Sequence, residues 1–373
     1  MGDGQYHYRH PIPFLGYKVR QLEESPMATR KRVTIRHVAQ EAAVSTQTVS
    51  RVINDRPDVA PETRIRVQQV ISHLGYQPSA LARSLIHQRS HTLGVVATGL
   101  EYYGPSHTLI GVEKQIRSLE YSLLLDLLHH PETEDVERII NRMLSRQVDG
   151  ILWAVPEIGN NRTWLKNKKL HSSAPMIFLS MEPLPDLFTV AIDNRLGGRL
   201  AVEHLISQGY RQIGIITGPL DWWEARQRLL GWRQALQAAR LPTEDRQIAE
   251  GNWSAASGEQ AIRKLLAQFP EIEAVFAGND QMALGVLQAM YKSGRRLPED
   301  LAVVGFDNIP ESAYFWPALT TVDQPLIELG CLAVEKLSQI IDADYQLEGK
   351  IESESIYLQP ELVVRDSTLV RSG

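Results

Sequence analysis

The segment from Val33 to Asn54 constrains the fold of this chain most strongly, because its pattern predicts two short helices joined by a tight turn. Thr34 is a suitable N-cap for the first helix, and Ser45 can cap a second helix in which Val49 and Val52 point inward. The second helix then begins with a polar edge. This arrangement is typical of a helix-turn-helix, whose second helix enters the major groove of DNA. The alternative is a small helical bundle with a polar face, but the next thirty residues also fit a DNA-binding headpiece.

The polar edge of the second helix carries side chains that can recognise base edges. Gln47 suits adenine, Thr46 suits methyl groups or acceptors, and Arg51 suits guanine or phosphate. The candidate DNA-binding residues of this segment are Thr34, Arg36, Ser45, Thr46, Gln47, Ser50, Arg51 and Asn54.

A third amphipathic helix is predicted from Thr63, with Gly75 as its C-cap. The following stretch, Ser79–Leu85, is only about two turns long, which is too short for an isolated helix in water. Its composition of Ala, Leu, Arg and Ser suits folding onto a second copy of the chain and onto DNA.

From about Val33 to its end, the chain resembles the lactose-repressor (LacI/GalR) family of transcription regulators. The resemblance implies that Ser79–Leu85 is a hinge helix that contacts DNA through Ser79, Ala82 and Leu85, with Leu85 wedged into the minor groove. One departure is Ala43, where many family members have glycine in the turn; we expect a small residue to serve there.

Charge is divided unevenly along the chain, whose formal net charge is −5. Positions 28–90 hold ten Lys/Arg and four Asp/Glu, a net charge of +6, whereas positions 1–27 are neutral and the remainder carries −11. A basic module joined to an acidic body indicates a headpiece that contacts phosphates and a body that does not wrap DNA.

Length and composition exclude several classes of protein. The 373 residues, 43% hydrophobic and 22% charged, predict an ordinary globular protein of two or three domains. No apolar run approaches the roughly 18 residues of a membrane span, and the start of the chain lacks the plan of a secretory signal. The single Cys331 excludes an internal disulfide and favours a reducing compartment, so we expect a cytoplasmic protein.

The domain boundaries follow from these patterns. We expect a disordered leader at 1–30, in which Met27 looks like a natural start, a headpiece at 31–76 and a hinge at 77–89. From position 90 onward, apolar strands alternate with amphipathic helices, which predicts an α/β core of two parallel sheets covered on both faces. By resemblance to periplasmic-binding-protein-like cores, the first half would contain 90–192 and 322–350, and the second half 193–321 and 351–373. The chain would cross between halves near Asp193, near 321–324 and around Lys350.

Two such halves predict a ligand cleft at the carboxyl ends of their strands. By resemblance, Arg228 reaches the effector, Trp253 stacks on it, and Asn279 contacts its hydroxyl groups. Asp307 can accept two hydroxyl protons, and Gln324 lies at a crossing where it can bridge both halves. The alternatives are a surface ion pair for Arg228 and a core role for Trp253.

The first half and the segment before Arg228 supply further candidates at strand ends or just after them: Tyr102, Tyr103, Asp126, Trp153 and Trp222. Aromatic rings and acids concentrated there favour a carbohydrate ligand over a phosphorylated one. Ser180 stands where the family often has an acid, so the orientation of the sugar can differ from that in the lactose repressor.

Together these features predict a homodimeric repressor that reads a pseudo-palindromic DNA operator and is released by a sugar bound in the cleft. The alternatives are a corepressor-dependent regulator that responds to a nucleobase or a partner protein, and an exported sugar-binding protein. An enzyme is not favoured, since no catalytic triad, phosphate loop or metal-ligand spacing is present and His129-His130 alone is a weak signal. We expect no cofactor.

Overall fold

The structure is a computed structural model that describes residues 33–76, 89–129, 136–166, 173–346 and 353–369. Contacts divide the chain into two units, one ending at Ser79 and the other beginning at Ala80. The predicted leader and hinge helix lie outside the described residues.

Three helices make up the described part of the first unit: α1 (Ile35–Glu41), α2 (Thr46–Ile53) and α3 (Pro61–Leu74). The predicted caps are found: Thr34 and Ser45 are the N-caps of α1 and α2, and the Ser45 Oγ accepts a hydrogen bond from the Thr48 N–H at 3.0 Å. Gly75 ends α3 with a left-handed φ of 61°, which glycine adopts without the clash of a Cβ atom.

Apolar side chains on the inner faces of these helices form one small core. Its fully or nearly buried members are Val38, Ala39, Ala42, Val49, Val52 and Val67. Ala43, in the turn between α1 and α2, has a φ of 52°, which strains a residue with a Cβ atom. This backbone conformation favours glycine, so alanine occupies the turn at a cost in strain.

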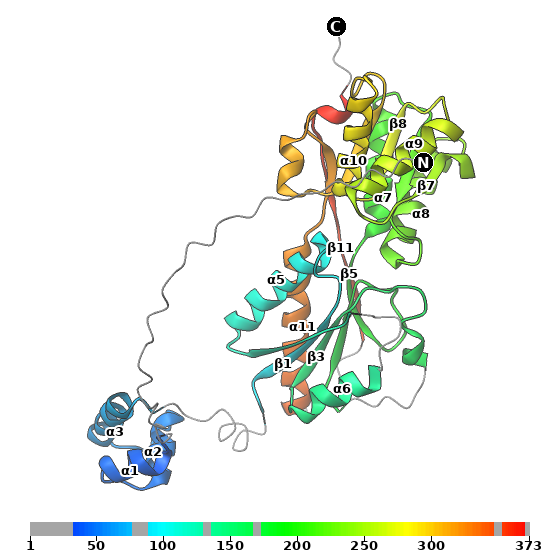
Figure 1. Ribbon diagram of the computed structural model, residues 1–373. Helices are drawn as coiled ribbons and strands as arrows, with labels where there is room; N and C mark the ends of the chain where they lie inside the picture. The colour runs from blue at the N-terminus through cyan, green and yellow to red at the C-terminus, as the bar shows by residue number, and fades with distance from the viewer. Residues whose placement is uncertain (1–32, 77–88, 130–135, 167–172, 347–352, 370–373) are drawn as a thin grey trace, which may run out of the picture. The chain divides into compact units, whose positions relative to one another are not determined.

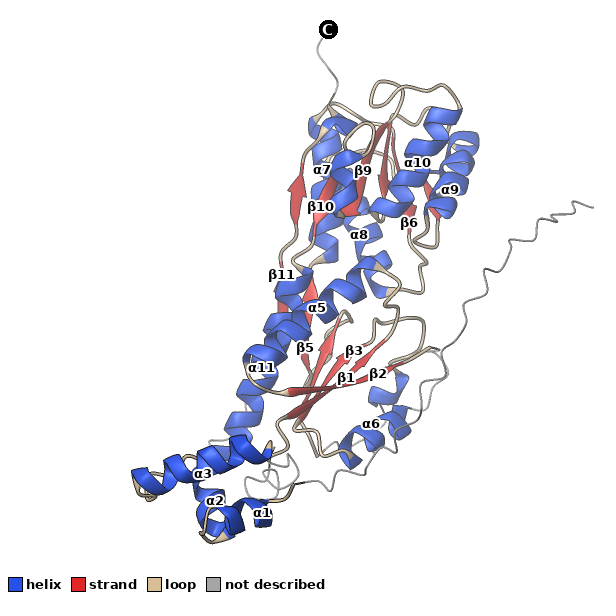
Figure 2. Ribbon diagram, turned by 60° about the vertical axis from the view of Figure 1, so that its left-hand side comes forward, coloured by secondary structure: helices blue, strands red, loops and turns tan. Residues whose placement is uncertain are grey.

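The second unit contains two six-stranded sheets (Figures 1 and 2). In the first sheet the strand order is β11-β5-β4-β3-β1-β2. The strands are β1 (Thr92–Ala97), β2 (Ser122–Leu127), β3 (Gly150–Ala154), β4 (Met176–Leu179), β5 (Phe188–Ile192) and β11 (Ser355–Leu358). All of its pairs are parallel. The helices of this half are α5 (Tyr103–Ser118), α6 (Val136–Ser145), the short η1 (Thr163–Lys166) and α11 (Leu326–Gln346), and α5 packs closely against α11.

The second sheet has the order β12-β10-β9-β8-β6-β7 and is parallel except for β12, which runs antiparallel to β10. Its strands are β6 (Ile213–Thr217), β7 (Ile248–Glu250), β8 (Ala274–Ala277), β9 (Ala302–Asp307), β10 (Thr320–Asp323) and β12 (Glu361–Val363). Its helices are α7 (Asn194–Ser207), α8 (Trp223–Ala238), α9 (Ala255–Gln268) and α10 (Asp280–Lys292), with short turns η2 (Asp245–Gln247), η3 (Pro310–Tyr314) and η4 (Asp366–Thr368). The alternation of strands and helices expected from the sequence is therefore present.

The chain passes from the first half to the second between β5 and α7, and it returns between β10 and α11. The third crossing was predicted around Lys350, and that prediction is wrong. β11 pairs in parallel with β5, with Leu358 opposite Ile192, so residues 355–358 belong to the first half and the crossing follows Leu358. The alternating polar and apolar residues of β11 suit an edge strand, whose outer face meets water.

Cys331 lies in α11, half-buried, where its thiol donates to the Gly111 carbonyl at 3.3 Å. Among the described helices, none has the length and hydrophobicity to cross a membrane.

Candidate functional site

The leading edge of α2 is exposed, as a base-reading surface must be. Thr46 and Gln47 occupy the first two positions of the helix and are exposed, directly after the Ser45 cap. The Ser45 cap fixes the backbone at the start of α2, from which these two side chains extend. Both side chains are therefore available to contact a base. Thr34 and Arg36, at the start of α1, are also exposed.

The remaining candidates on α2 are partly engaged within the unit. Asn54 donates through its amide to the Ser50 carbonyl at 2.9 Å, and Arg51 lies 3.4 Å from the carboxylate of Asp58. These contacts orient the side chains but leave them available to DNA, because Arg51 remains exposed and its ion pair is weak in water. The candidates Ser79, Ala82 and Leu85 lie outside the described residues.

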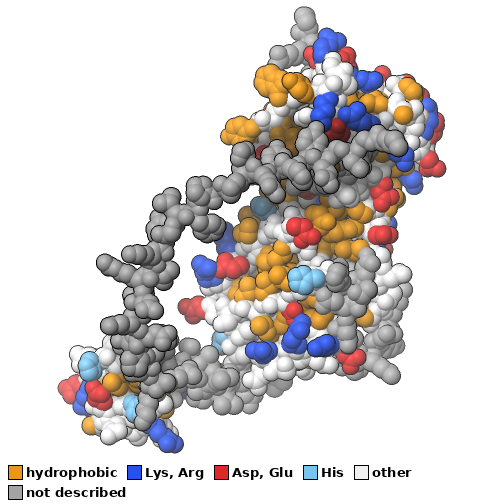
Figure 3. Space-filling model, in the orientation of Figure 1, with side chains coloured by type: hydrophobic (Ala, Val, Ile, Leu, Met, Phe, Trp, Pro, Cys, Tyr) orange, Lys and Arg blue, Asp and Glu red, His pale blue; other side chains and the backbone are white. Residues whose placement is uncertain are grey.

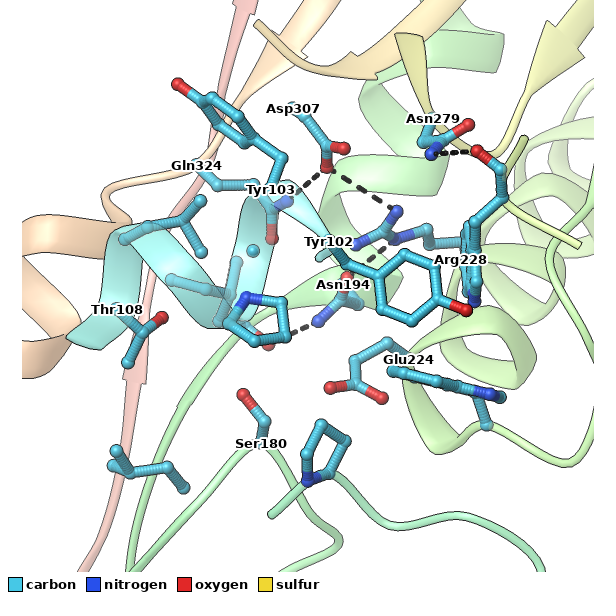
Figure 4. Close-up of a pocket in the computed structure, with 18 of the residues that line it drawn as sticks. Tyr102, Tyr103, Thr108, Ser180, Asn194, Glu224, Arg228, Asn279, Asp307 and Gln324 are labelled. Atoms are coloured by element: carbon cyan, nitrogen blue, oxygen red, sulfur yellow. Dashed lines mark hydrogen bonds and ion pairs between the residues drawn. The ribbon is translucent and has the colours of Figure 1, made fainter. Parts of the chain in front are cut away.

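In the second unit, a pocket opens between the two halves (Figure 4). The space inside its lining is about 770 Å³, part of which is open to solvent. Eight of the ten predicted effector contacts line it: Tyr102, Tyr103, Trp222, Arg228, Trp253, Asn279, Asp307 and Gln324.

Arg228 is buried in the floor of the pocket by the close packing of α7 and α8. A Cβ atom on Gly231 would lie 2.2 Å from the Arg195 carbonyl oxygen, so this approach of the two helices requires glycine. The result is that the Arg228 Nε donates to the Asn194 Oδ1 at 2.8 Å. The Arg228 Nη1 donates to the Gly278 carbonyl and lies 3.8 Å from Asp307.

The guanidinium of Arg228 is also stacked on rings. Its central carbon lies 3.8 Å from the ring centroid of Phe306 and 5.5 Å from that of Trp253. Burial lowers the pKa of Arg228, and Asp307 opposes this, so the guanidinium keeps its charge. A buried cation held by an aromatic face, an amide and a carboxylate can present its remaining N–H groups to a ligand.

Asp307, at the end of β9, is the acid partner of this cation. Gln324 donates to the Asp307 Oδ1 at 2.6 Å, and Figure 4 shows both contacts of this carboxylate. Burial raises the pKa of Asp307 to about 6, while Arg228 and Gln324 pull it down. The group is therefore mostly ionised at neutral pH and can accept hydrogen bonds from a ligand.

Several aromatic rings stand at right angles to one another beside the cation. Trp222 meets Trp253 edge-on with centroids 5.8 Å apart, and Tyr102 meets Trp222 edge-on at 5.6 Å. Asn279 caps α10 by accepting from the Met282 N–H at 2.9 Å, and it donates to the Trp253 carbonyl at 3.0 Å. Its amide thereby fixes the turn that carries Trp253. Tyr103 stacks on His107, with centroids 3.7 Å apart.

The pocket is lined by strained backbone. Three of its non-glycine residues have left-handed φ angles: 55° at Ser180, 71° at Trp253 and 110° at Asp307. Such conformations cost about 1–3 kcal/mol each and cluster at functional sites. Asp307 is the last residue of β9 and Ser180 directly follows β4, so two of the three lie at the carboxyl ends of strands.

Two predicted contacts do not reach the pocket. Asp126, on the edge strand β2, is paired with Arg142, whose Nε lies 2.8 Å away. Trp153 is buried in the core of the first half and packs against Trp164 and Phe178. Successive side chains of a strand point to opposite faces, so it is the neighbouring Ala154 that lines the pocket.

The structure also adds residues that sequence reasoning did not select: Thr108, Asn194 and Glu224 line the pocket. Asn194 follows the crossing at Asp193, which is a signal that could have been used. Glu224 looked like an ordinary acidic residue in the first turn of a helix. Among the described residues, no group of His, Cys, Asp and Glu is arranged to hold a metal ion.

Two family descriptions match the chain. Residues 34–79 match "Bacterial regulatory proteins, lacI family", and residues 202–368 match "Periplasmic binding protein-like domain". The match to the first covers all three helices of the described headpiece.

Curated relatives match over nearly their whole length. The HTH-type transcriptional repressor PurR of Klebsiella pneumoniae is 36% identical over 337 residues, which are 90% of this chain and 96% of that protein. The ribose operon repressor of Escherichia coli is 36% identical over 90% of this chain and 99% of its own length. Catabolite control protein A of Priestia megaterium is 33% identical over 90% of this chain and 99% of its own length.

Solved structures of similar architecture carry DNA or a ligand. The lac repressor dimer bound to operator and an anti-inducer matches with a TM-score of 0.81 at 30% identity, over 91% of this chain and the whole of that one. A complex of the transcriptional regulator CelR with cellobiose matches with a TM-score of 0.66 at 30% identity, over 90% of this chain and all of its own. The chain has an exposed helix-turn-helix and two mostly parallel sheets around a pocket, and curated relatives match 90% of its length, so it belongs to the lacI family of bacterial transcription regulators.

Proposed function

We propose that this regulator is a repressor that is released from its operator by an uncharged sugar bound in the pocket. The observation that carries the proposal is the lining of that pocket: edge-on aromatic rings at Trp222 and Trp253 lie beside the Arg228–Asp307 pair. Flat rings pack against the C–H faces of a sugar, and paired charged groups bind its hydroxyls. The ribose operon repressor and the CelR–cellobiose complex, among its relatives, bear names that agree with this class of ligand.

The pocket is placed to couple ligand binding to DNA binding. Tyr102 and Ser180 come from the first half, whereas Arg228 and Asp307 come from the second, so a ligand that contacts all four favours one arrangement of the halves. By linkage, a ligand that weakens operator binding must itself be bound more weakly by the operator complex. The proposed DNA contacts are the exposed Thr46 and Gln47, with the hinge residues Ser79, Ala82 and Leu85. We place this protein in the cytoplasm, acting as a homodimer without a cofactor or an enzymatic activity.

The test begins with the DNA that the protein enriches from a random library. Fluorescence anisotropy of that DNA is then followed while glucose, galactose, ribose and cellobiose are added, and a thermal-shift assay reports binding to the protein directly. We expect at least one sugar to raise the melting temperature and release the DNA. Tighter DNA binding on adding ligand would instead indicate corepression, and no response to any sugar would refute a sugar effector.

Substitution of a pocket residue should abolish the release of DNA by sugar. Arg228→Ala should bind the enriched DNA as wild type does and fail to release it at the sugar concentration that releases wild type. Arg233→Ala on the same helix, which lies outside the pocket lining, is the control that should still respond.

A further inference from the structure

Glu224 is the second residue of α8, and its carboxyl group enters the pocket between Ser180 and Arg228 (Figure 4). The side chain as a whole is half-buried, but its Oε2 atom is shielded from solvent and has no hydrogen-bond partner among the described residues. A buried carboxylate oxygen without a partner costs free energy, so a pocket that keeps one holds an acceptor available for a ligand.

The charged groups around Glu224 are engaged with other partners. On its own helix, Arg228 is bound by Asn194 and Gly278, and the Arg226 Nη2 donates to the Glu157 Oε1 at 2.7 Å. Glu157, which faces Glu224 from the loop after β3, is thus already paired. Tyr102, whose ring lies next to Glu224 in Figure 4, contributes a neutral phenol.

We propose that Glu224 is a specificity-determining residue of the pocket, where it accepts hydrogen bonds from the hydroxyl groups of an uncharged sugar. This rests on the sugar-responsive function proposed above. In Figure 4, Asp307 and Glu224 lie on opposite sides of Arg228, so the ligand meets an acid on each side of the cation. A ligand with hydroxyl groups at both positions satisfies both acids, whereas a phosphate or carboxylate next to Glu224 is repelled.

Proton release then accompanies binding. Burial raises the pKa of Glu224 to about 7; the backbone, Arg228 and Arg226 oppose the rise, and Glu157 adds to it. Hydroxyl groups that donate to the carboxylate favour its ionised form, so the pKa falls when the sugar binds. If only the ionised form binds, affinity should rise about fourfold between pH 6.5 and 8.5.

The test is isothermal titration calorimetry with whichever of glucose, galactose, ribose or cellobiose gives the largest thermal shift, at pH 6.5, 7.5 and 8.5. Wild type should show the fourfold rise and release protons, seen as a binding enthalpy that depends on the ionisation enthalpy of the buffer. Glu224→Gln, of the same shape, should bind about 10- to 100-fold more weakly at pH 8.5 and lose most of the pH dependence. Glu203→Gln, an exposed glutamate on α7, is the matched control and should behave as wild type.

The outcomes distinguish the role of Glu224 from the sugar-responsive function on which it rests. If no sugar binds wild type, the sugar-responsive function fails and this proposal with it. If a sugar binds wild type but Glu224→Gln has the same affinity and pH profile, only the role of Glu224 is refuted. Glu224→Ser, which removes the carboxyl without adding bulk, should repeat the loss, and unchanged binding of the enriched DNA shows that each variant is folded. Preference of wild type for glucose 6-phosphate over glucose would also overturn the proposal.

Discussion

Glu157 and Arg226 join the two halves of the core beside the pocket: the Glu157 Oε1 accepts a hydrogen bond from the Arg226 Nη2 at 2.7 Å. The Arg162 Nη1 forms an ion pair with the other carboxylate oxygen at 2.9 Å. Main-chain bonds reinforce the junction, since the Trp223 N–H donates to the Glu157 carbonyl at 2.9 Å and the Gly159 N–H donates to the Asp221 carbonyl at 2.8 Å. The segment before α8 is therefore attached to the loop that follows β3 by both side chains and backbone.

Arg226→Met should weaken this junction while keeping the aliphatic length of the side chain. Glu157 is 4% exposed and would retain Arg162, and Arg226 is 37% exposed, so the loss should be about 1–2 kcal/mol rather than the 3–5 kcal/mol of a fully buried pair. We expect a lower melting temperature. We also expect weaker sugar binding, because the junction helps to hold the two halves in the arrangement that forms the pocket. Arg199→Met, which removes a surface ion pair on α7, is the control; equal effects of the two substitutions would show that the junction has no special role.

Asp280 should make the core less stable as the pH rises. Burial, helped by the nearby Asp307, raises the pKa of Asp280 to about 8, although Thr321 and the Ile309 N–H donate to it. The folded protein therefore holds this proton more tightly than the unfolded chain, and the resulting stability is complete below about pH 4 and lost as the pH rises through 8. Between pH 6.5 and 8 the loss should be about 1–2 kcal/mol. Asp280→Asn should reduce the dependence of melting temperature on pH. The control Asp300→Asn, at the surface, should leave that dependence unchanged. A wild-type melting temperature that rises between pH 6.5 and 8 would contradict the raised pKa of Asp280.

The sequence predicted those features that depend on local pattern. Ser45 and Gly75 mark helix ends because their side chain, or lack of one, acts within a single turn of backbone. Pocket membership depends instead on which face of a strand a residue occupies and on what crosses it. For this reason Trp153 was predicted to line the pocket when its neighbour in the strand does. Residues 355–358 were assigned to the wrong half because their partner strand, in which Ile192 lies opposite Leu358, is far away in the sequence. Glu224 was missed because nothing local distinguishes an acid facing a pocket from one facing water.

Gln47→Ala should remove sequence discrimination at one base pair of each half-site. Gln47 is exposed at the start of α2, and loss of a good base contact costs about 1–3 kcal/mol. The measurement is anisotropy with enriched DNA and its single-base variants at a fixed salt concentration. Arg36→Ala, at an exposed position on α1, should weaken binding to specific and random DNA alike; the same uniform loss for Gln47→Ala would refute base reading.

Ala43→Gly should stabilise the headpiece, because a φ of 52° strains alanine and not glycine. We expect about 0.5–1 kcal/mol, seen as about two- to fivefold slower hydrogen exchange at the buried Val49 amide in the full chain. Ala42→Gly is a demanding control one residue away: Ala42 is fully buried with a right-handed φ of −78°, so glycine there should speed the exchange. Faster exchange in both variants would show that the turn is not strained.

The assembly is expected to be a dimer that pairs through both halves of the core. Segments 111–116 of α5 and 280–290 of α10 are candidates for this pairing, but Val112 and Ile116 are buried inside the chain, where α5 packs on α11. The neighbouring Ile110 is 51% exposed and Leu284 on α10 is 40% exposed, which are the side chains available to a second copy. Figure 3 shows hydrophobic side chains gathered over the surface that carries α5 and β2, and Leu125 and Leu127 of this edge strand are exposed.

Ile110→Glu combined with Leu284→Glu should give a monomer, because burying two carboxylates in an apolar interface is unfavourable. Sedimentation velocity at micromolar concentration should show a dimer for wild type and a monomer for the double variant, with loss of affinity for twofold-symmetric DNA. Leu230→Glu, at an exposed position on α8, is the control and should remain dimeric. A stable tetramer without DNA, or a double variant that stays dimeric, would show that the chains pair through a different surface.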